Sequence, residues 1–320
     1  MGKDDDVSQW QEGNRALLGC GLLIAISKKH REPTKIAEPA RFGESSRARS
    51  FTIAFVLESL SQEARERVDR LELQFGSYGV DHFGVSKRHL AQFFTTLGVF
   101  YRHYLKVTRE GMQHIPARGR VMLIGNHSGG VALDGAMVLA SLFFDREPPR
   151  LAQGMAEKFI NKTPFMSSWA CRTGQLTGLP EHAEQLLAAE RALLVFPEGA
   201  RGTAKLRKQG DSLVEFGTGF LRLAMKMRTP IVPFAFVGGG DAIPTIANLY
   251  SIGKWFGVPY LPVTPYILPI PLPVKVGLFY GAPMHFEGTG NEDDTHVQGM
   301  VSGVKEKIRS LIHLGREVIT

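Results

Sequence analysis

A histidine and an aspartate flank a glycine-rich turn in the stretch VMLIGNHSGGVALDGAM, residues 121–137. His127 follows an apolar strand pattern, and sites in α/β sheets form where strands end. Asp134 begins the next helical pattern, from which a carboxylate can reach back to one imidazole nitrogen and leave the other as a general base. The N–H groups of Gly129 and Gly130 are candidates for holding an oxyanion. Aspartate is also a favoured helix cap and Gly-Gly a common loop sequence, so a structural role stays open.

A carboxylate and a cluster of cations follow a second apolar run, in LLVFPEGARGTAKLRK, residues 193–208. Glu198, Gly199 and Arg201 come directly after the strand pattern. A guanidinium group can bind a phosphate with two hydrogen bonds, and loop N–H groups can add to them. The pattern predicts a phosphate-binding loop, although a solvated basic loop would account for residues 205–208 equally well.

The elements that would position these residues form an α/β pattern. From residue 110 onward short apolar strands alternate with helices, which indicates βαβ units and a mostly parallel sheet flanked by helices. Amphipathic patterns predict an N-terminal helical extension, with helices over residues 51–76 and 86–107. Residues 30–50 are polar, contain proline and glycine, and predict a linker or surface loop.

Two apolar stretches fall outside this pattern. Residues 16–26 are too few to span a bilayer and fit a buried helix or an interfacial membrane helix equally well. Residues 257–274 carry no charge and six prolines, which exclude a spanning helix and a central strand. They fit a lid packed on the body or a loop that reaches the lipid boundary.

We therefore divide the chain into three parts. Residues 1–107 form a helical region that could associate with a membrane, and residues 108–290 form the α/β domain. Residues 291–320 form a C-terminal amphipathic helix packed on that domain, because five apolar side chains share one face. These are Val297, Val301, Val304, Ile308 and Leu311.

The composition narrows the class of partner. The chain has 320 residues, 43% of them hydrophobic and 22% charged, as in an ordinary folded protein. Its net charge of +7 favours an anionic partner such as anionic lipid or a phosphorylated substrate. Nucleic-acid-binding motifs are not visible, and the two cysteines form no metal-binding pattern. The acidic start is unlike a cleaved signal peptide.

Three stretches of the α/β part, NHSGGVALD, FPEGARG and IVPFAFVG, resemble motifs one, three and four of the glycerolipid acyltransferase family. That family includes the lysophosphatidate (1-acylglycerol-3-phosphate) acyltransferases, and the resemblance spans roughly residues 104–286. It implies that His127 is the catalytic base and Asp134 its partner. Glu198, Gly199 and Arg201 would form the acceptor-binding motif, in which the arginine holds the acceptor phosphate.

The sequence departs from the family pattern at two places. Six residues separate His127 from Asp134, whereas four do so in the widespread form, which places the chain with a long-loop NHSGG subgroup. The second motif lacks its usual basic residue, for which Arg172 is the available substitute.

The resemblance implies an acyltransferase that moves a fatty acyl group from acyl-CoA or acyl carrier protein to a hydroxyl of a (lyso)glycerophospholipid-type acceptor. It implies no metal and no cofactor beyond the thioester co-substrate. Acyl chains and lysolipids reside in bilayers, so we expect the protein at an anionic membrane surface, peripheral or monotopic, on the cytoplasmic face. The alternatives are a thioester or ester hydrolase that uses the same histidine, and a non-catalytic lipid-binding protein.

Overall fold

The computed structural model describes residues 42–128, 132–156, 166–255, 257–267 and 270–319. The apolar stretch 16–26, for which the sequence predicts either a buried or an interfacial helix, lies outside the described residues. The residues from Ala48 onward form one compact unit. None of the helices in the described ranges is long and apolar enough to cross a membrane.

A seven-stranded sheet forms the centre of this unit, in the order β1-β9-β6-β2-β5-β3-β4. Neighbouring strands are parallel except for β6 and β9, which pair antiparallel. This confirms the predicted α/β class with a mostly parallel sheet. The strands are β1 (Thr108–Glu110), β2 (Val121–Gly125), β3 (Ala152–Ala156), β4 (Leu176–Thr177), β5 (Ala192–Val195), β6 (Ile231–Val237) and β9 (Gly277–Tyr280).

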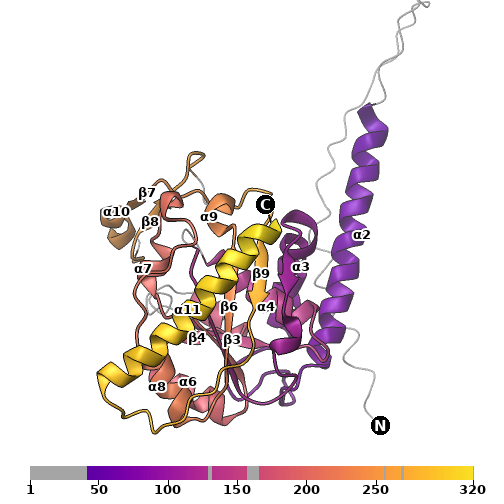
Figure 1. The fold of residues 1–320 in the computed structure, drawn as a ribbon. Coiled ribbons are helices and arrows are strands. Elements are labelled where there is room, and N and C mark those ends of the chain that lie inside the picture. The colour runs from indigo at the N-terminus through magenta and orange to yellow at the C-terminus, as the bar shows by residue number, and fades with distance from the viewer. Residues whose placement is uncertain (1–41, 129–131, 157–165, 256, 268–269, 320) are drawn as a thin grey trace, which may run out of the picture. The chain divides into compact units, whose positions relative to one another are not determined.

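Helices cover both faces of the sheet. Successive strand residues point to opposite faces, and both faces carry apolar side chains that the helices bury. Leu123 belongs to an apolar cluster with residues of α2, α3 and α4, whereas Ile124 belongs to a second cluster with residues of α6, α8 and α11. Figure 1 shows α11 running across the sheet. These helices are α2 (Phe42–Asp69), α3 (Lys87–Gly98), α4 (Leu133–Phe144), α6 (Pro180–Ala188), α8 (Gly219–Lys226) and α11 (Asp294–Ile319).

Shorter helices lie in the connections between these elements. They are α5 (Met166–Arg172), α7 (Ala200–Thr203), α9 (Gly239–Ala242) and α10 (Tyr250–Trp255), with a π-helical turn at Val99–Tyr104 and 3₁₀ turns at Met112–His114 and Arg207–Gln209. The predicted C-terminal helix is present as α11, and all five apolar residues predicted for its inner face are buried.

Two segments refine the sequence interpretation. The helix α2 begins at Phe42, so residues 42–50 are helical and not a linker. Their polar composition gives no apolar stripe, so hydrophobic periodicity does not predict a helix there. Within 257–274, β8 (Leu261–Val263) pairs with β7 (Ala247–Leu249) in a separate two-stranded sheet, outside the main sheet as the prolines predict.

Candidate active site

The strand β2 carries His127 to the centre of the sheet edge. It lies between β5 and β6, and all three strands run parallel, so their carboxyl ends meet at one edge. Asn126, the first residue after the strand, exchanges two hydrogen bonds with the backbone of Phe236 on β6, at 2.9 and 2.8 Å. This amide fixes the start of the loop and leaves His127 at a defined position above the sheet.

His127 and Asp134 contact each other directly. The imidazole Nδ1 lies 2.9 Å from Asp134 Oδ2, and the carboxylate is fully buried. The N–H of Ser128 donates to the same oxygen at 2.7 Å, and the N–H of Gly135 donates to Oδ1. The described residues offer no hydrogen bond to Nε2, which leaves that nitrogen for a substrate.

Burial by itself would raise the pKa of the Asp134 carboxyl. Charge attraction and hydrogen bonding from His127, with the N–H donors of Ser128 and Gly135, outweigh it and hold that pKa below its ordinary value. Asp134 therefore stays ionised, keeps the imidazole oriented and stabilises it when it takes up a proton.

The lowered pKa of Asp134 has a consequence for stability. The native state favours the ionised form, so this group stabilises the fold above its unfolded pKa of about 3.9 and loses that contribution as pH falls through the lower folded pKa. We expect the stability difference between wild type and Asp134→Asn to shrink as pH falls from about 6 to about 3. Urea unfolding of both proteins across this range measures it, with the exposed Glu317→Gln as control. A difference that grows toward low pH would contradict the assignment.

A phenylalanine and a glycine pack against His127. The ring of Phe196 stacks on that of His127, with centroids 3.9 Å apart and planes 13° from parallel. On α7, a side chain at Gly202 would meet His127 and Glu198, because a Cβ there would lie 2.6 Å from His127 Cβ and 2.5 Å from Glu198 Oε2. This position therefore requires glycine.

A buried ion pair connects the two sequence motifs. Lys205 Nζ lies 2.6 Å from Glu198 Oε2, and both side chains are almost completely buried. The same ammonium group donates to the carbonyl oxygens of His127, at 2.5 Å, and Ser212, at 2.7 Å. Lys205 therefore links the backbone at His127 to the carboxylate of Glu198 through one ammonium group.

The environment of Glu198 raises its pKa. Burial dominates, and the attraction of Lys205 and His127 offsets it only in part. Glu198 therefore depends on Lys205 for charge compensation, in contrast to Asp134, whose pKa is lowered. Both carboxylates lie beside His127, but their environments push their pKa values in opposite directions.

Apart from Arg172, the other residues of the predicted site lie on or beside α7 or outside the described residues. Gly199 directly precedes α7 with φ 56° and ψ −150°, a conformation that glycine alone adopts readily. Arg201 lies on α7, exposed to solvent, with Nη2 3.3 Å from the carbonyl oxygen of Glu215. Gly129 and Gly130, predicted to hold an oxyanion, lie outside the described residues.

Arg172 lies elsewhere in the described structure. Its carbonyl accepts from the N–H of Ser86 at 2.9 Å, and the neighbouring Cys171 contacts Phe83. Phe83 packs against the guanidinium of Arg191, which directly precedes β5. Arg172 therefore lies toward the amino ends of the strands, whereas His127 lies at their carboxyl ends.

Sequence reasoning missed three residues of the site. Asn126 and Gly202 lie within the two motifs, and their adjacency to His127 and Glu198 was the available signal. Lys205 fits either a phosphate-binding loop or a solvated basic loop in the sequence, and nothing in its spacing shows that its side chain is buried.

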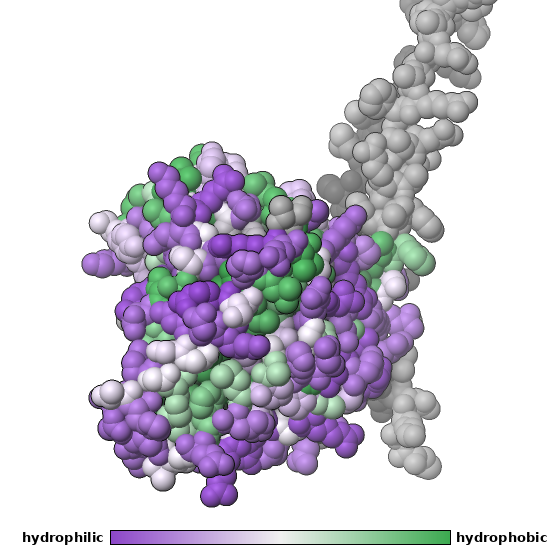
Figure 2. Space-filling view, in the orientation of Figure 1, coloured by the Kyte–Doolittle hydropathy of each residue, from purple (hydrophilic) through white to green (hydrophobic). Residues whose placement is uncertain are grey.

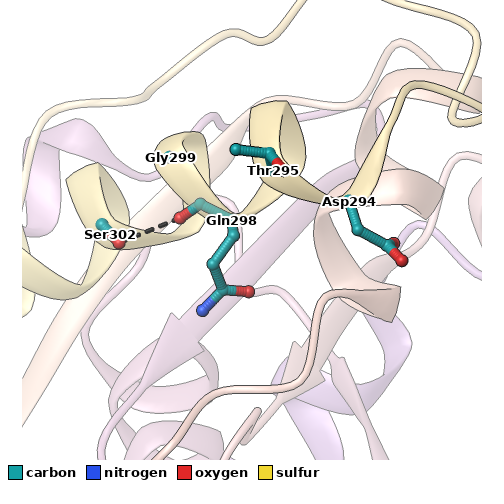
Figure 3. Close-up of a pocket in the computed structure, with 5 residues that line it drawn as sticks. All are labelled: Asp294, Thr295, Gln298, Gly299 and Ser302. Atoms are coloured by element: carbon teal, nitrogen blue, oxygen red, sulfur yellow. Dashed lines mark hydrogen bonds between the residues drawn. The ribbon is translucent and has the colours of Figure 1, made fainter.

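A separate shallow pocket lies along the first turns of α11 and is lined by Asp294, Thr295, Gln298, Gly299 and Ser302 (Figure 3). All five residues come from one helix, and Ser302 Oγ donates to the carbonyl of Gln298. Its lining contains no histidine and no cation, so it offers none of the chemistry of the His127 site.

Comparison with known proteins gives a family match and several relatives. Residues 106–237 match the Acyltransferase family model. Uncharacterized proteins of Mycobacterium bovis and Mycobacterium tuberculosis are 27% identical over 250 residues, which cover 74% of this chain and 70% of theirs. The crystal structure of the 1-acyl-sn-glycerophosphate (LPA) acyltransferase PlsC from Thermotoga maritima is similar at 20% identity and a TM-score of 0.46, over 70% of this chain and 83% of that one.

Proposed function

We propose that this chain, whose residues 106–237 match the Acyltransferase family model, transfers a fatty acyl group from a thioester to a hydroxyl of a (lyso)glycerophospholipid-type acceptor. The thioester is acyl-CoA or acyl carrier protein. The observation that supports the proposal best is the buried pair of His127 and Asp134, in which no described residue hydrogen-bonds to Nε2 of the imidazole.

The proposed reaction uses this geometry. Nε2 of His127 takes the proton of the acceptor hydroxyl while its oxygen attacks the thioester carbonyl, a contribution worth roughly 10²–10⁴-fold in rate. The tetrahedral intermediate collapses with cleavage of the C–S bond, and the imidazolium returns the proton to the leaving thiolate. Asp134 stabilises the imidazolium between these two steps.

Arg201 is proposed to hold the phosphate of the acceptor. It is exposed on α7, the helix whose Gly202 packs against His127, and in the proposed complex its guanidinium would bring the acceptor phosphate toward the base. Positioning the acceptor in this way converts a two-body encounter into a reaction within one complex.

Removing this guanidinium should weaken acceptor binding. Hydrogen bonds to a charged group are worth about 1.5–3 kcal/mol, so we expect Arg201→Ala to raise KM for a phosphorylated acceptor about 10- to 100-fold. The turnover number should change much less. Steady-state kinetics with varied acceptor measures this, and Lys208→Ala, an exposed cation of the same segment, serves as control. A loss of kcat with unchanged KM would contradict the role.

The proposed reaction can be tested with labelled acyl-CoA and a panel of lysolipid and glycerol-phosphate acceptors. We expect an acylated product that forms only when an acceptor is present. Acyl release at equal rates with and without acceptor would identify a hydrolase. Lipid binding without any turnover, unchanged after replacement of His127, would identify a binding protein.

We also propose that the protein works peripherally or monotopically at an anionic membrane surface on the cytoplasmic face. Its substrates carry acyl chains, and the net charge of +7 favours anionic lipid.

A further inference from the structure

The segment that follows β6 and α9 has an unusual composition. Residues 245–274 contain no aspartate or glutamate and a single cation, Lys254. It contains one tryptophan, three tyrosines and four isoleucines. Such a segment repels neither lipid tails nor anionic head groups.

Its apolar side chains are exposed to an unusual degree. Eight of the seventeen large hydrophobic side chains that are exposed among the described residues fall here, with Trp255 82% and Ile267 80% exposed. The eight are Ile246, Leu249, Tyr250, Ile252, Trp255, Ile267, Ile270 and Leu272. We call the described residues 246–255, 257–267 and 270–272 the apolar lobe.

Figure 1 shows β7, β8 and α10 together at one end of the molecule, and Figure 2 shows hydrophobic surface at that end. Exposed apolar surface of this kind marks an interaction site, whereas single exposed apolar residues do not.

The apolar lobe is attached to the active site. The chain enters it after the carboxyl end of β6, the sheet edge that also carries His127. The side chain of Asn248 donates to the carbonyl of Ala204 at 2.6 Å, and the N–H of Arg207 donates to the carbonyl of Thr245 at 2.8 Å. Both partners belong to the segment that also carries Glu198 and Lys205.

The charges around the lobe favour a lipid surface over a protein partner. Lys254 lies within it, and Arg201 and Lys208 are exposed on the segment that contacts it. Tryptophan and tyrosine beside cations are typical of side chains at the boundary between head groups and acyl chains. Residues 245–274 contain no carboxylate that would repel anionic head groups.

We infer that the apolar lobe inserts into the surface of an anionic bilayer and so presents the active site to substrates that reside there. The inference deepens the proposed function, since it names the membrane-contacting element beside the same site. Insertion of a tryptophan or isoleucine side chain removes its apolar surface from water, so a few such residues decide whether the protein stays on the membrane.

Vesicle flotation of the full chain tests this inference. We expect the triple variant Ile252→Ser, Trp255→Ser, Ile267→Ser to bind vesicles of phosphatidylglycerol and phosphatidylcholine at least about tenfold more weakly than wild type. Tyr78→Ser, which removes an equally exposed aromatic side chain outside the lobe, should bind like wild type. Equal binding by the triple variant and wild type overturns the inference.

A second measurement does not depend on the triple variant folding correctly. In a chain with Trp10→Phe and Trp169→Phe, Trp255 is the remaining tryptophan, and brominated lipids should quench its fluorescence. Absence of quenching in vesicle-bound protein overturns the inference. So does concentration-dependent dimerisation in sedimentation that the triple variant abolishes, because a second copy would then cover the lobe.

These outcomes are separate from a failure of the proposed function. Flotation and quenching need no turnover, so they succeed even if the protein transfers no acyl group. Conversely, the triple variant should retain activity toward a short-chain acyl-CoA and a water-soluble acceptor, because its substitutions lie outside the His127 site.

Discussion

Replacing His127 by alanine should lower the turnover number about 10²–10⁴-fold, the range that a positioned general base contributes. The imidazole is the proposed base, and its Nδ1 is held by Asp134 at 2.9 Å, which leaves Nε2 for the acceptor hydroxyl. A variant without it keeps substrate binding but loses the proton acceptor, so kcat falls more than KM rises. Single-turnover measurements with saturating acyl-CoA separate the two.

Two comparisons make this test specific. His313→Ala removes an exposed histidine on α11 and should leave activity unchanged. Asp134→Asn keeps the shape of the carboxylate but presents an amide to the imidazole, which favours the wrong tautomer, and it should lose activity by a similar factor. Full activity in His127→Ala would refute the mechanism.

Replacing Lys205 by methionine should destabilise the fold by about 3–5 kcal/mol, the usual loss when one partner of a buried ion pair is removed. Glu198 would remain buried without its counter-charge, and the carbonyl oxygens of His127 and Ser212 would lose a shared donor. Urea unfolding near neutral pH measures the loss.

The double variant Lys205→Met, Glu198→Gln provides the control, because it removes the uncompensated charge. We expect it to recover part of the stability lost in the single variant. The loss in Lys205→Met should also shrink as pH falls, since burial already raises the pKa of Glu198 and a protonated carboxyl needs no counter-charge. Equal stability of wild type and Lys205→Met would show that the pair contributes nothing.

The sequence predicted the residues that local spacing determines. His127 and Asp134 meet because a strand, a turn and a helix follow each other within a few residues, and that order is visible in the chain. The inner face of α11 was predictable for the same reason, since its apolar residues recur with the period of a helix.

The remaining features depend on contacts between distant parts of the chain. The ammonium group of Lys205 reaches the carbonyl of His127, 78 positions away, and no local pattern separates such a lysine from a solvated one. The sequence of the second motif offers Arg172, but the fold packs this residue beside Ser86, far away in the chain from the motif. The strand β9 is short, and its antiparallel pairing with β6 follows no βαβ rule.

The placement of β9 limits how the protein can be shortened. The family match ends at Val237 with β6, but β9 lies between β6 and β1 in the sheet. A fragment of residues 106–237 would leave β6 as an open edge and β1 without its neighbour, and it would also lack α11, which packs on β6. Open apolar edges pair between molecules and lead to aggregation. Gene truncations, fusions and minimal catalytic versions of this protein must therefore keep the residues up to the end of α11.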